Sequence, residues 1–319
     1  MSPNDGKNVT TADPQENRAR HFRRQLIRSL AHVGLTGTPF LIALSLVIGI
    51  CGGVSALVFR WLIGTFSTLF LADVPAYLGS NDYLPAITAV GFVIVAILVN
   101  KFAKEAKGAG IPEVMAAVAT DNGVIRPRVA FVKVIASALC IGSGGSVGRE
   151  GPIVQIGSAA GSSIGQLLGF SGERLKVLVG CGAAAGISAT FNAPIAGGFF
   201  ALEVILGDFS ISTFSPILFS SVTANAVMRY SSVNEVAFAV PDYHLNSLYE
   251  LIFYFVLAIL CGFTAVFFSK MLYAAEDLFE KITHSEYARA CLGGLVIGGL
   301  GLYYPQILGV GYETITDIL

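Results

Sequence analysis

A glycine-rich loop that carries one arginine and one glutamate is the segment best suited to chemistry. It reads Gly142-Ser143-Gly144-Gly145-Ser146-Val147-Gly148-Arg149-Glu150-Gly151-Pro152. Pro152 suits the first turn of a helix, where its missing N–H costs nothing, so we expect a helix to begin here. The glycines leave backbone N–H groups bare, and such groups at a helix N-terminus attract anions through hydrogen bonds and the helix dipole.

The glutamate in this loop can compete with an anion. When Glu150 is ionised, its carboxylate could occupy the anion's own place, and protonation or displacement would vacate it. Glu150 is therefore a candidate gate, a proton carrier, or both, because carboxylates within membranes are usually functional. The alternative is a structural carboxylate at a helix N-terminus that forms a salt bridge with Arg149.

Two further breaks interrupt apolar sequence. In Gly108-Ala109-Gly110-Ile111-Pro112-Glu113, Gly-x-Gly again precedes a proline at an expected helix start. Phe191-Asn192-Ala193-Pro194 leads into an apolar run that contains Glu203. Glu203 is either an inner-mouth residue that reaches water or a residue with a direct role. Glycines at 157, 161, 165 and 169 form a stripe that predicts close helix packing. They do not indicate a nucleotide-binding fingerprint, because no strand precedes them as that motif requires.

The composition indicates that lipid is the solvent for much of the surface. Hydrophobic residues make up 54% of the 319 positions and charged residues only 13%, against about 25% charged in soluble domains. A net charge of −1 gives no bulk electrostatic support for nucleic-acid binding. The five cysteines form no CxxC pair, so neither a disulfide framework nor a metal site is expected.

The apolar runs are uneven in length. A crossing needs about 20 residues, and we expect spans at Pro39 to about Ala72, Leu84 to about Phe102, Leu248 to about Leu272, and Ala290 to Tyr303. The segments Val129–Ile141, Gly151–Phe170, Leu175–Phe191 and Pro216–Met228 are shorter or mixed in polarity. Helices broken at membrane depth are tolerated inside protein or along a cavity, and they often place helix N-termini at an ion site.

A polar N-terminal segment precedes these runs. It carries a basic cluster formed by Arg18, Arg20, Arg23, Arg24 and Arg28. The positive-inside rule places residues 1–38 in the cytoplasm, so we expect a multi-pass protein of the cell (inner) membrane.

At these motifs the sequence resembles the CLC family of chloride channels and chloride/proton antiporters. Gly148-Arg149-Glu150-Gly151-Pro152 reproduces the family's GREGP/GKEGP signature, Gly108 to Pro112 resembles its GSGIP element, and Asn192 to Glu203 resembles the segment after the central helix break. The order and spacing of the three motifs agree with the family. The resemblance covers about Pro39 to the C-terminus.

The resemblance implies an all-α, polytopic membrane protein with tilted and broken helices, an inverted repeat, and a homodimer with one pathway per subunit. Residues 39–230 would form the first repeat, 231–246 a connecting loop, and 247–319 the start of an incomplete second repeat. It also implies a bound chloride ion, no cofactor and no metal. Glu150 matches the gating glutamate, and the implied anion-binding residues are Gly108, Ala109, Gly110, Ile111, Gly148, Arg149 and Gly151.

Three departures from the family pattern bear on function. Ala109 stands where many relatives have a serine hydroxyl on the anion. Val204 stands where antiporters have an internal proton-transfer glutamate, beside Glu203, which matches the first acidic residue of that pair. The chain also ends at Leu319, before the family's GxFxP element and pore tyrosine.

These features predict transport of chloride or a similar small anion, with a voltage- or pH-gated channel as the main hypothesis because valine cannot carry a proton. The alternatives are a chloride/proton antiporter and a non-conducting truncated fragment. An enzyme is not expected, because an intramembrane protease would need paired catalytic groups, and neither HExxH nor GxSxG with suitable partners is present.

Overall fold

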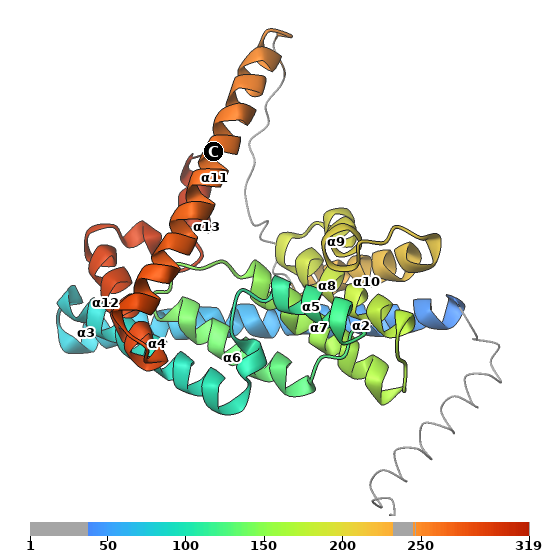
Figure 1. Ribbon diagram of the computed structural model, residues 1–319, viewed down its shortest axis with the longest axis horizontal. Helices are drawn as coiled ribbons and strands as arrows, with labels where there is room; N and C mark the ends of the chain where they lie inside the picture. The colour runs from blue at the N-terminus through green and yellow to red at the C-terminus, as the bar shows by residue number, and fades with distance from the viewer. Residues whose placement is uncertain (1–37, 232–244, 246, 319) are drawn as a thin grey trace, which may run out of the picture.

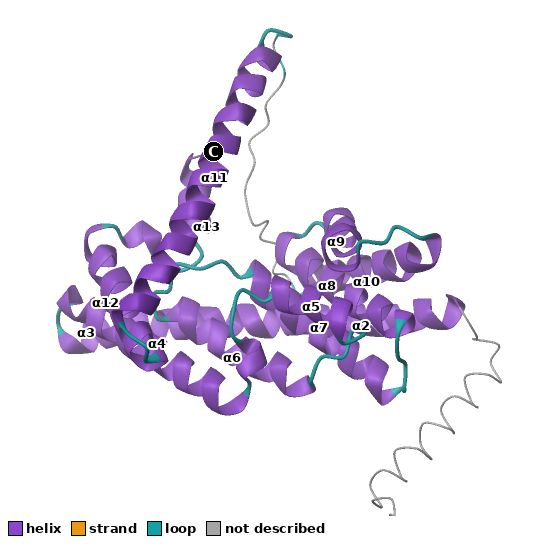
Figure 2. Ribbon diagram, viewed as in Figure 1, coloured by secondary structure: helices purple, strands orange, loops and turns teal. Residues whose placement is uncertain are grey.

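The computed structural model describes residues 38–231, 245 and 247–318. Within these ranges every regular element is helical, and no strand occurs (Figure 2). The predicted all-α class is therefore confirmed. The basic cluster of residues 18–28 and most of the expected connecting loop, 232–244 and 246, lie outside the described residues.

The helices differ widely in length, and several are interrupted by turns (Figure 1). Their bounds are α2 (Thr38–Ser67), α3 (Val74–Leu78), α4 (Leu84–Phe102), α5 (Ile111–Thr120), α6 (Pro127–Gly142), α7 (Glu150–Leu167), α8 (Glu173–Phe191), α9 (Pro194–Phe200), α10 (Ile211–Tyr230), α11 (Glu250–Ile282), α12 (Glu286–Tyr303) and α13 (Tyr312–Ile318). A π-helical turn, Thr68–Asp73, joins α2 to α3, and another, Ala201–Leu206, continues α9. A 3-10 turn at Lys104–Ala106 lies before α5.

Several of these helices can cross a membrane. In the described residues, five helical stretches are long and apolar enough, namely Pro39–Leu78, Leu84–Phe102, Glu173–Phe191, Ile211–Tyr230 and Glu250–Ile282. The predicted segment Pro216–Met228 was too short. Helix α10 begins before Pro216, at Ile211, and has 20 residues. Each predicted break coincides with a helix boundary, since α5, α7 and α9 begin at Ile111, Glu150 and Pro194, inside the three predicted breaks.

The expected glycine stripe packs helix against helix. A methyl group added at Gly157 or Gly161 would collide with backbone carbonyls of α8, so the two helices touch backbone to backbone, as small residues allow in membranes. Gly169 does not belong to this face, because it follows the end of α7 with φ of 71°. Helix α8 lies at the centre of the core, where Leu178, Val179 and Cys181 are fully buried.

The later helices are less enclosed. Helix α12 packs against α4, with Gly294 and Gly298 against the α4 backbone. Helix α11 rises away from the other helices (Figure 1), and none of its residues is buried within the described part of the chain. Its surface is apolar along most of its length, as expected for contact with lipid or other apolar partners.

Candidate functional site

The two glycine loops predicted from sequence meet in space. Gly110 has φ of 106°, a conformation that only glycine adopts at low cost. A methyl group on Gly110 would collide with the carbonyl oxygen of Gly151, and one on Gly151 would collide with that of Ala109. The loop before α5 therefore lies directly against the first turn of α7, and both helix N-termini are presented to one region.

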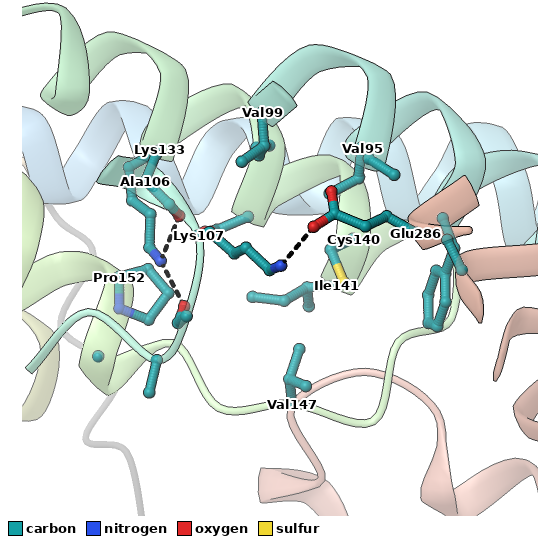
Figure 3. Close-up of a pocket in the computed structure, with 18 of the residues that line it drawn as sticks. Val95, Val99, Ala106, Lys107, Lys133, Cys140, Ile141, Val147, Pro152 and Glu286 are labelled. Atoms are coloured by element: carbon teal, nitrogen blue, oxygen red, sulfur yellow. Dashed lines mark hydrogen bonds and ion pairs between the residues drawn. The ribbon is translucent and has the colours of Figure 1, made fainter. Parts of the chain in front are cut away.

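A buried lysine fixes the first loop. Lys133 on α6 is 3% exposed, and its Nζ donates hydrogen bonds to the carbonyl oxygens of Ala106 at 3.0 Å and Gly108 at 2.7 Å (Figure 3). A buried ammonium is tolerated only with such partners. Because Lys133 binds the carbonyls of this loop, it fixes the backbone that leads into α5.

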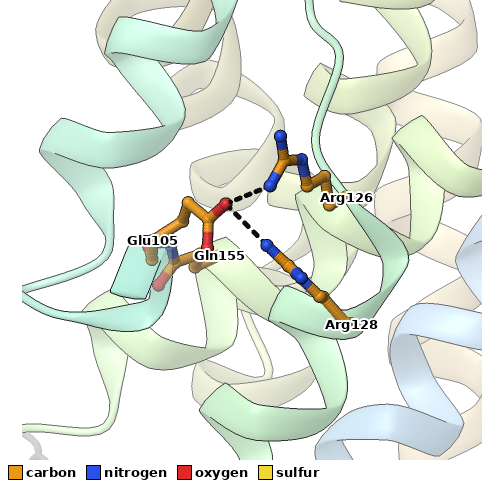
Figure 4. Close-up of polar contacts among 4 residues, drawn as sticks. All are labelled: Glu105, Arg126, Arg128 and Gln155. Atoms are coloured by element: carbon orange, nitrogen blue, oxygen red, sulfur yellow. Dashed lines mark hydrogen bonds and ion pairs between the residues drawn. The ribbon is translucent and has the colours of Figure 1, made fainter. Parts of the chain in front are cut away.

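A polar cluster fixes the turn that precedes this loop (Figure 4). Arg126 and Arg128 donate to Oε1 of Glu105 at 2.8 and 3.1 Å, and Nε2 of Gln155 on α7 donates to the Glu105 carbonyl oxygen at 3.0 Å. A hydrogen bond from its own backbone, followed by those from Arg128, holds the pKa of Glu105 below its usual value. The cluster thus joins the α5 loop to α6 and α7.

The first loop carries its own carboxylate cap. The N–H of Gly110 donates to Oε2 of Glu113, three residues along, at 2.6 Å. This is one half of a capping box, since glycine has no side chain to supply the other half. The carboxylate of Glu113 is therefore already bound to the N-terminus of its own helix.

The carboxylate of Glu150 takes a different arrangement at the first residue of α7. It folds back against Gly148, where an added methyl group would collide with Oε2, and its Oε1 accepts a hydrogen bond from the Tyr312 hydroxyl. The guanidinium of Arg149 lies over the Tyr312 ring, 4.7 Å from its centroid. In the described part of the chain, the buried Nε of Arg149 has no hydrogen-bond partner, so a donor is left for an anion.

Two cavities adjoin this carboxylate. The first has a volume of about 790 Å³ and is lined by Glu150 together with Gly148, Gly108, Ala109, Ile111 and Gly151. The second, of about 860 Å³, is lined by Arg149 and Tyr312. The Glu150–Tyr312 hydrogen bond therefore joins a wall of one cavity to a wall of the other.

The far side of the first cavity is charged. Lys107 forms an ion pair with Glu286 at 2.7 Å (Figure 3), and this hydrogen bond, together with a second from Asn100, holds the pKa of Glu286 below its usual value. Other charged residues of α11 and α12 that line it are Glu276, Glu280 and Arg289. Among the described residues, no group of His, Cys, Asp or Glu side chains could hold a metal ion.

The predicted inner pair, Glu203 and Val204, lies on the π-helical turn Ala201–Leu206, away from this site. Glu203 is exposed, and Val204 is half-buried and packs against the main apolar core. Neither lines the cavity that holds Glu150. The site residues predicted around Gly108–Ile111 and Gly148–Gly151 are thus brought together, whereas Glu203 and Val204 are not.

Three residues of the site were not predicted. Lys133 could have been found as the one cation in the apolar run Val129–Ile141. Tyr312 and Glu286 gave no local signal, because each meets the glycine loops only through tertiary contact, across 162 residues for Tyr312–Glu150 and 179 for Lys107–Glu286.

The sequence matches a known family and named relatives. The family described as "Voltage gated chloride channel" matches residues 91–319. The H(+)/Cl(-) exchange transporter ClcA of Vibrio cholerae is 34% identical over 306 residues, covering 88% of this chain and 63% of that relative. A Ralstonia nicotianae protein described as ClcB-like is 34% identical over 214 residues, covering 66% of this chain and 50% of that relative.

Solved structures share the fold. A slow cyanobacterial Cl-/H+ antiporter has a TM-score of 0.73 at 23% identity, covering 83% of this chain and 64% of that one. A CLC-type fluoride/proton antiporter has a TM-score of 0.74 at 24% identity, covering 88% and 70%. The chain belongs to the CLC family of voltage-gated chloride channels and transporters and has the CLC fold. It spans about half to two thirds of the length of the curated relatives that it matches.

Proposed function

We propose that this protein carries chloride across a bilayer through a pathway gated by Glu150, in exchange for protons. The position of the Glu150 carboxylate carries the proposal. It lines one cavity, its hydrogen-bond partner lines a second, and two helix N-termini and an unpartnered Arg149 Nε lie beside it. A carboxylate here can take the place of an anion when ionised and release that place when protonated.

Exchange, rather than the channel that the sequence predicted, is the better-supported mode. A relative that is 34% identical over most of this chain is named an H(+)/Cl(-) exchange transporter. The first cavity also brings three carboxylates of α11 and α12, Glu276, Glu280 and Glu286, to the space that Glu150 lines. Groups that could carry a proton are therefore present without Glu203.

A channel is the second candidate, and one observation favours it. Proton movement through a membrane requires titratable groups or water along the route. Val204 cannot titrate, and the adjacent Glu203 is exposed and outside the cavity of Glu150. If no other group serves the inner side, Glu150 would gate chloride without coupled proton transport.

The wider organisation follows the family resemblance. We propose a multi-pass inner-membrane transporter without a cofactor, with residues 1–38 cytoplasmic, a first repeat at 39–230 and a second that begins near 247. We also propose a homodimer with one pathway per subunit.

Paired flux measurements on the full chain in liposomes test the proposal. A chloride gradient should drive protons uphill in a fixed ratio to chloride, and Glu150→Gln should keep chloride flux but abolish proton movement. Glu173→Gln is a matched control, because Glu173 also begins a helix but is exposed and lines neither cavity.

The outcomes separate the candidates. Chloride flux without proton uptake in the native protein would overturn exchange and leave the channel. Sustained proton pumping abolished by Glu203→Gln would make Glu203 the inner relay. No chloride flux in any variant would overturn transport and favour the non-conducting alternative.

A further inference from the structure

The phenol ring of Tyr312 lies between two residues at the ends of the site helices. Arg149, the N-cap of α7, lies over its face at 4.7 Å. Phe191, the last residue of α8, packs against it with ring centroids 6.4 Å apart and tilted by 42°. Cation–π and tilted aromatic contacts are both favourable. The two contacts restrict where the ring, and hence its hydroxyl, can lie.

The backbone before Tyr312 directs the residue inward. Gly311 has φ of 77°, so the chain turns at a conformation that other residues rarely adopt, and α13 begins at the next residue. The half-buried Tyr312 then reaches across to Glu150. This placement depends on the fold of the whole chain and not on the loop that carries the gate.

We propose that Tyr312 is a positioning residue that holds the Glu150 carboxylate in its closed place and sets the pH at which the gate opens. The inference rests on the proposed function and extends it. An ionised carboxylate accepts a hydroxyl hydrogen bond about twice as strongly as a neutral group does. The Tyr312 hydroxyl therefore stabilises the charged, closed form of Glu150 more than the protonated, open form.

The position between the two cavities gives this contact its consequence. The hydrogen bond holds Glu150, in the wall of the cavity of about 790 Å³, to Tyr312, in the wall of the cavity of about 860 Å³. Protonation of Glu150 weakens the bond, and the side chain can leave. The gate is thus a pair of side chains that lie 162 residues apart in the chain, and not a single glutamate.

Other charged groups surround the pair and remain unchanged in the test. The charged or titratable side chains on the neighbouring elements are Arg149 on α7, Lys133 and Cys140 on α6, Glu113 on α5, Lys107 before α5, Glu276 and Glu280 on α11, Glu286 and Arg289 on α12, Arg60 on α2 and Asp317 on α13. Removing one hydroxyl alters none of their charges. A change in the pH response of Tyr312→Phe therefore reports the loss of the hydroxyl, and the double variant with Glu150→Gln shows whether that loss acts through Glu150.

The experiment compares chloride flux with pH in liposomes for the native chain, Tyr312→Phe, Glu150→Gln and the double variant. Phenylalanine keeps the ring and its face contacts with Arg149 and Phe191, and it removes the interactions of the hydroxyl with Glu150 and Arg149. Tyr312→Phe should shift the midpoint of the flux–pH curve upward by about one pH unit, the order expected for a lost hydrogen bond to a charged group. Tyr303→Phe, at an 82% exposed tyrosine, should leave the curve unchanged.

The double variant shows whether Tyr312 acts through Glu150. It should match Glu150→Gln alone, with no pH dependence left to shift. If Glu150→Gln behaves as proposed but Tyr312→Phe keeps the native midpoint, the inference is wrong and the gate assignment stands. If the native chain shows no chloride flux, or Glu150→Gln keeps the native pH profile, the proposed function and this inference fail together.

Discussion

The two glycine loops look alike in sequence and differ in how their glutamates are held. Each loop precedes a helix with proline in its first turn and carries a glutamate within that turn. Glu113 is bound by the N–H of Gly110 in its own loop. Glu150 is bound by Tyr312, a side chain 162 residues away.

This difference assigns the two carboxylates different roles. A carboxylate bound by its own helix end completes the helix, and its release would leave a buried N–H unsatisfied. A carboxylate bound by a distant side chain can leave without unravelling its helix. The local motif therefore creates two similar helix ends, and we propose that tertiary contact decides which glutamate can move.

The largest expected effect comes from breaking the contact between the loops. Gly110→Ala places a methyl group against the Gly151 carbonyl at φ of 106°. Such a conformation costs on the order of 1–3 kcal/mol for a non-glycine residue, and the collision adds to it. We expect chloride flux in liposomes to fall by roughly tenfold or more.

A matched glycine serves as the control. Gly293 on α12 has open space where a methyl group would lie and no unusual backbone angle. Gly293→Ala should retain native flux. Native flux in Gly110→Ala would mean that the loops need not touch for transport.

The second prediction separates the two glutamates. Glu113→Ala leaves the buried N–H of Gly110 without its partner, so the free energy of unfolding should fall by about 1–3 kcal/mol, seen as a lower melting temperature in detergent. Glu113→Gln keeps an acceptor oxygen and should recover most of that loss. Neither variant should change the pH dependence of chloride flux, whereas Glu150→Gln should remove it. If chloride flux through Glu113→Ala lost its pH dependence, the two helix ends would not have distinct roles.

Much of the fold could be predicted because its signals are local. Leu84–Phe102 was predicted and observed with the same bounds, and the breaks at Gly108, Gly148 and Asn192 each precede a helix start. Pro216 misled the prediction for α10, because a proline inside a helix usually ends or kinks it, yet α10 runs through the buried Pro216. The extension of α11 to Ile282 was missed because charged residues follow Leu272.

The site could be predicted only in part. Glycine and proline mark the loops, and the family signature marks Glu150 as the candidate gate. The contacts that hold these loops come from Lys133, Glu286 and Tyr312, whose positions depend on how the helices pack. No spacing along the chain predicts such contacts.

The third prediction tests whether the first loop faces the anion. Ala109 is exposed in the first cavity, so Ala109→Ser adds a hydroxyl donor there. A neutral hydrogen bond contributes about 0.5–1.5 kcal/mol net, which corresponds to chloride affinity tighter by up to about tenfold. Calorimetric titration with chloride measures it. Unchanged affinity would indicate that the anion approaches only the α7 loop.

The smallest expected effect concerns the distant contact of the first loop. Lys107, just before Gly108, pairs with Glu286 on α12, as Glu150 pairs with Tyr312 on α13. The Lys107 and Glu286 side chains are 62% and 40% exposed, and solvent screening reduces such a pair to about 0–1 kcal/mol. Unlike the Tyr312 contact, it should therefore restrain its loop only weakly.

The direction of its pH dependence follows from the pKa of Glu286, which the hydrogen bond from Lys107 lowers. A lowered pKa in the folded state means that the stabilisation is fully present above the unfolded pKa and is lost as pH falls through the folded value. Glu286→Gln should thus lower the melting temperature slightly near pH 7, and the difference should shrink as the pH falls through the lowered pKa of Glu286 and in high salt. Because Glu286 also lines the cavity of Glu150, chloride flux should be measured alongside. A large loss of stability at pH 7 would show that both loops are held by the C-terminal helices with similar strength, and the contrast between a fixed and a releasable glutamate would no longer hold.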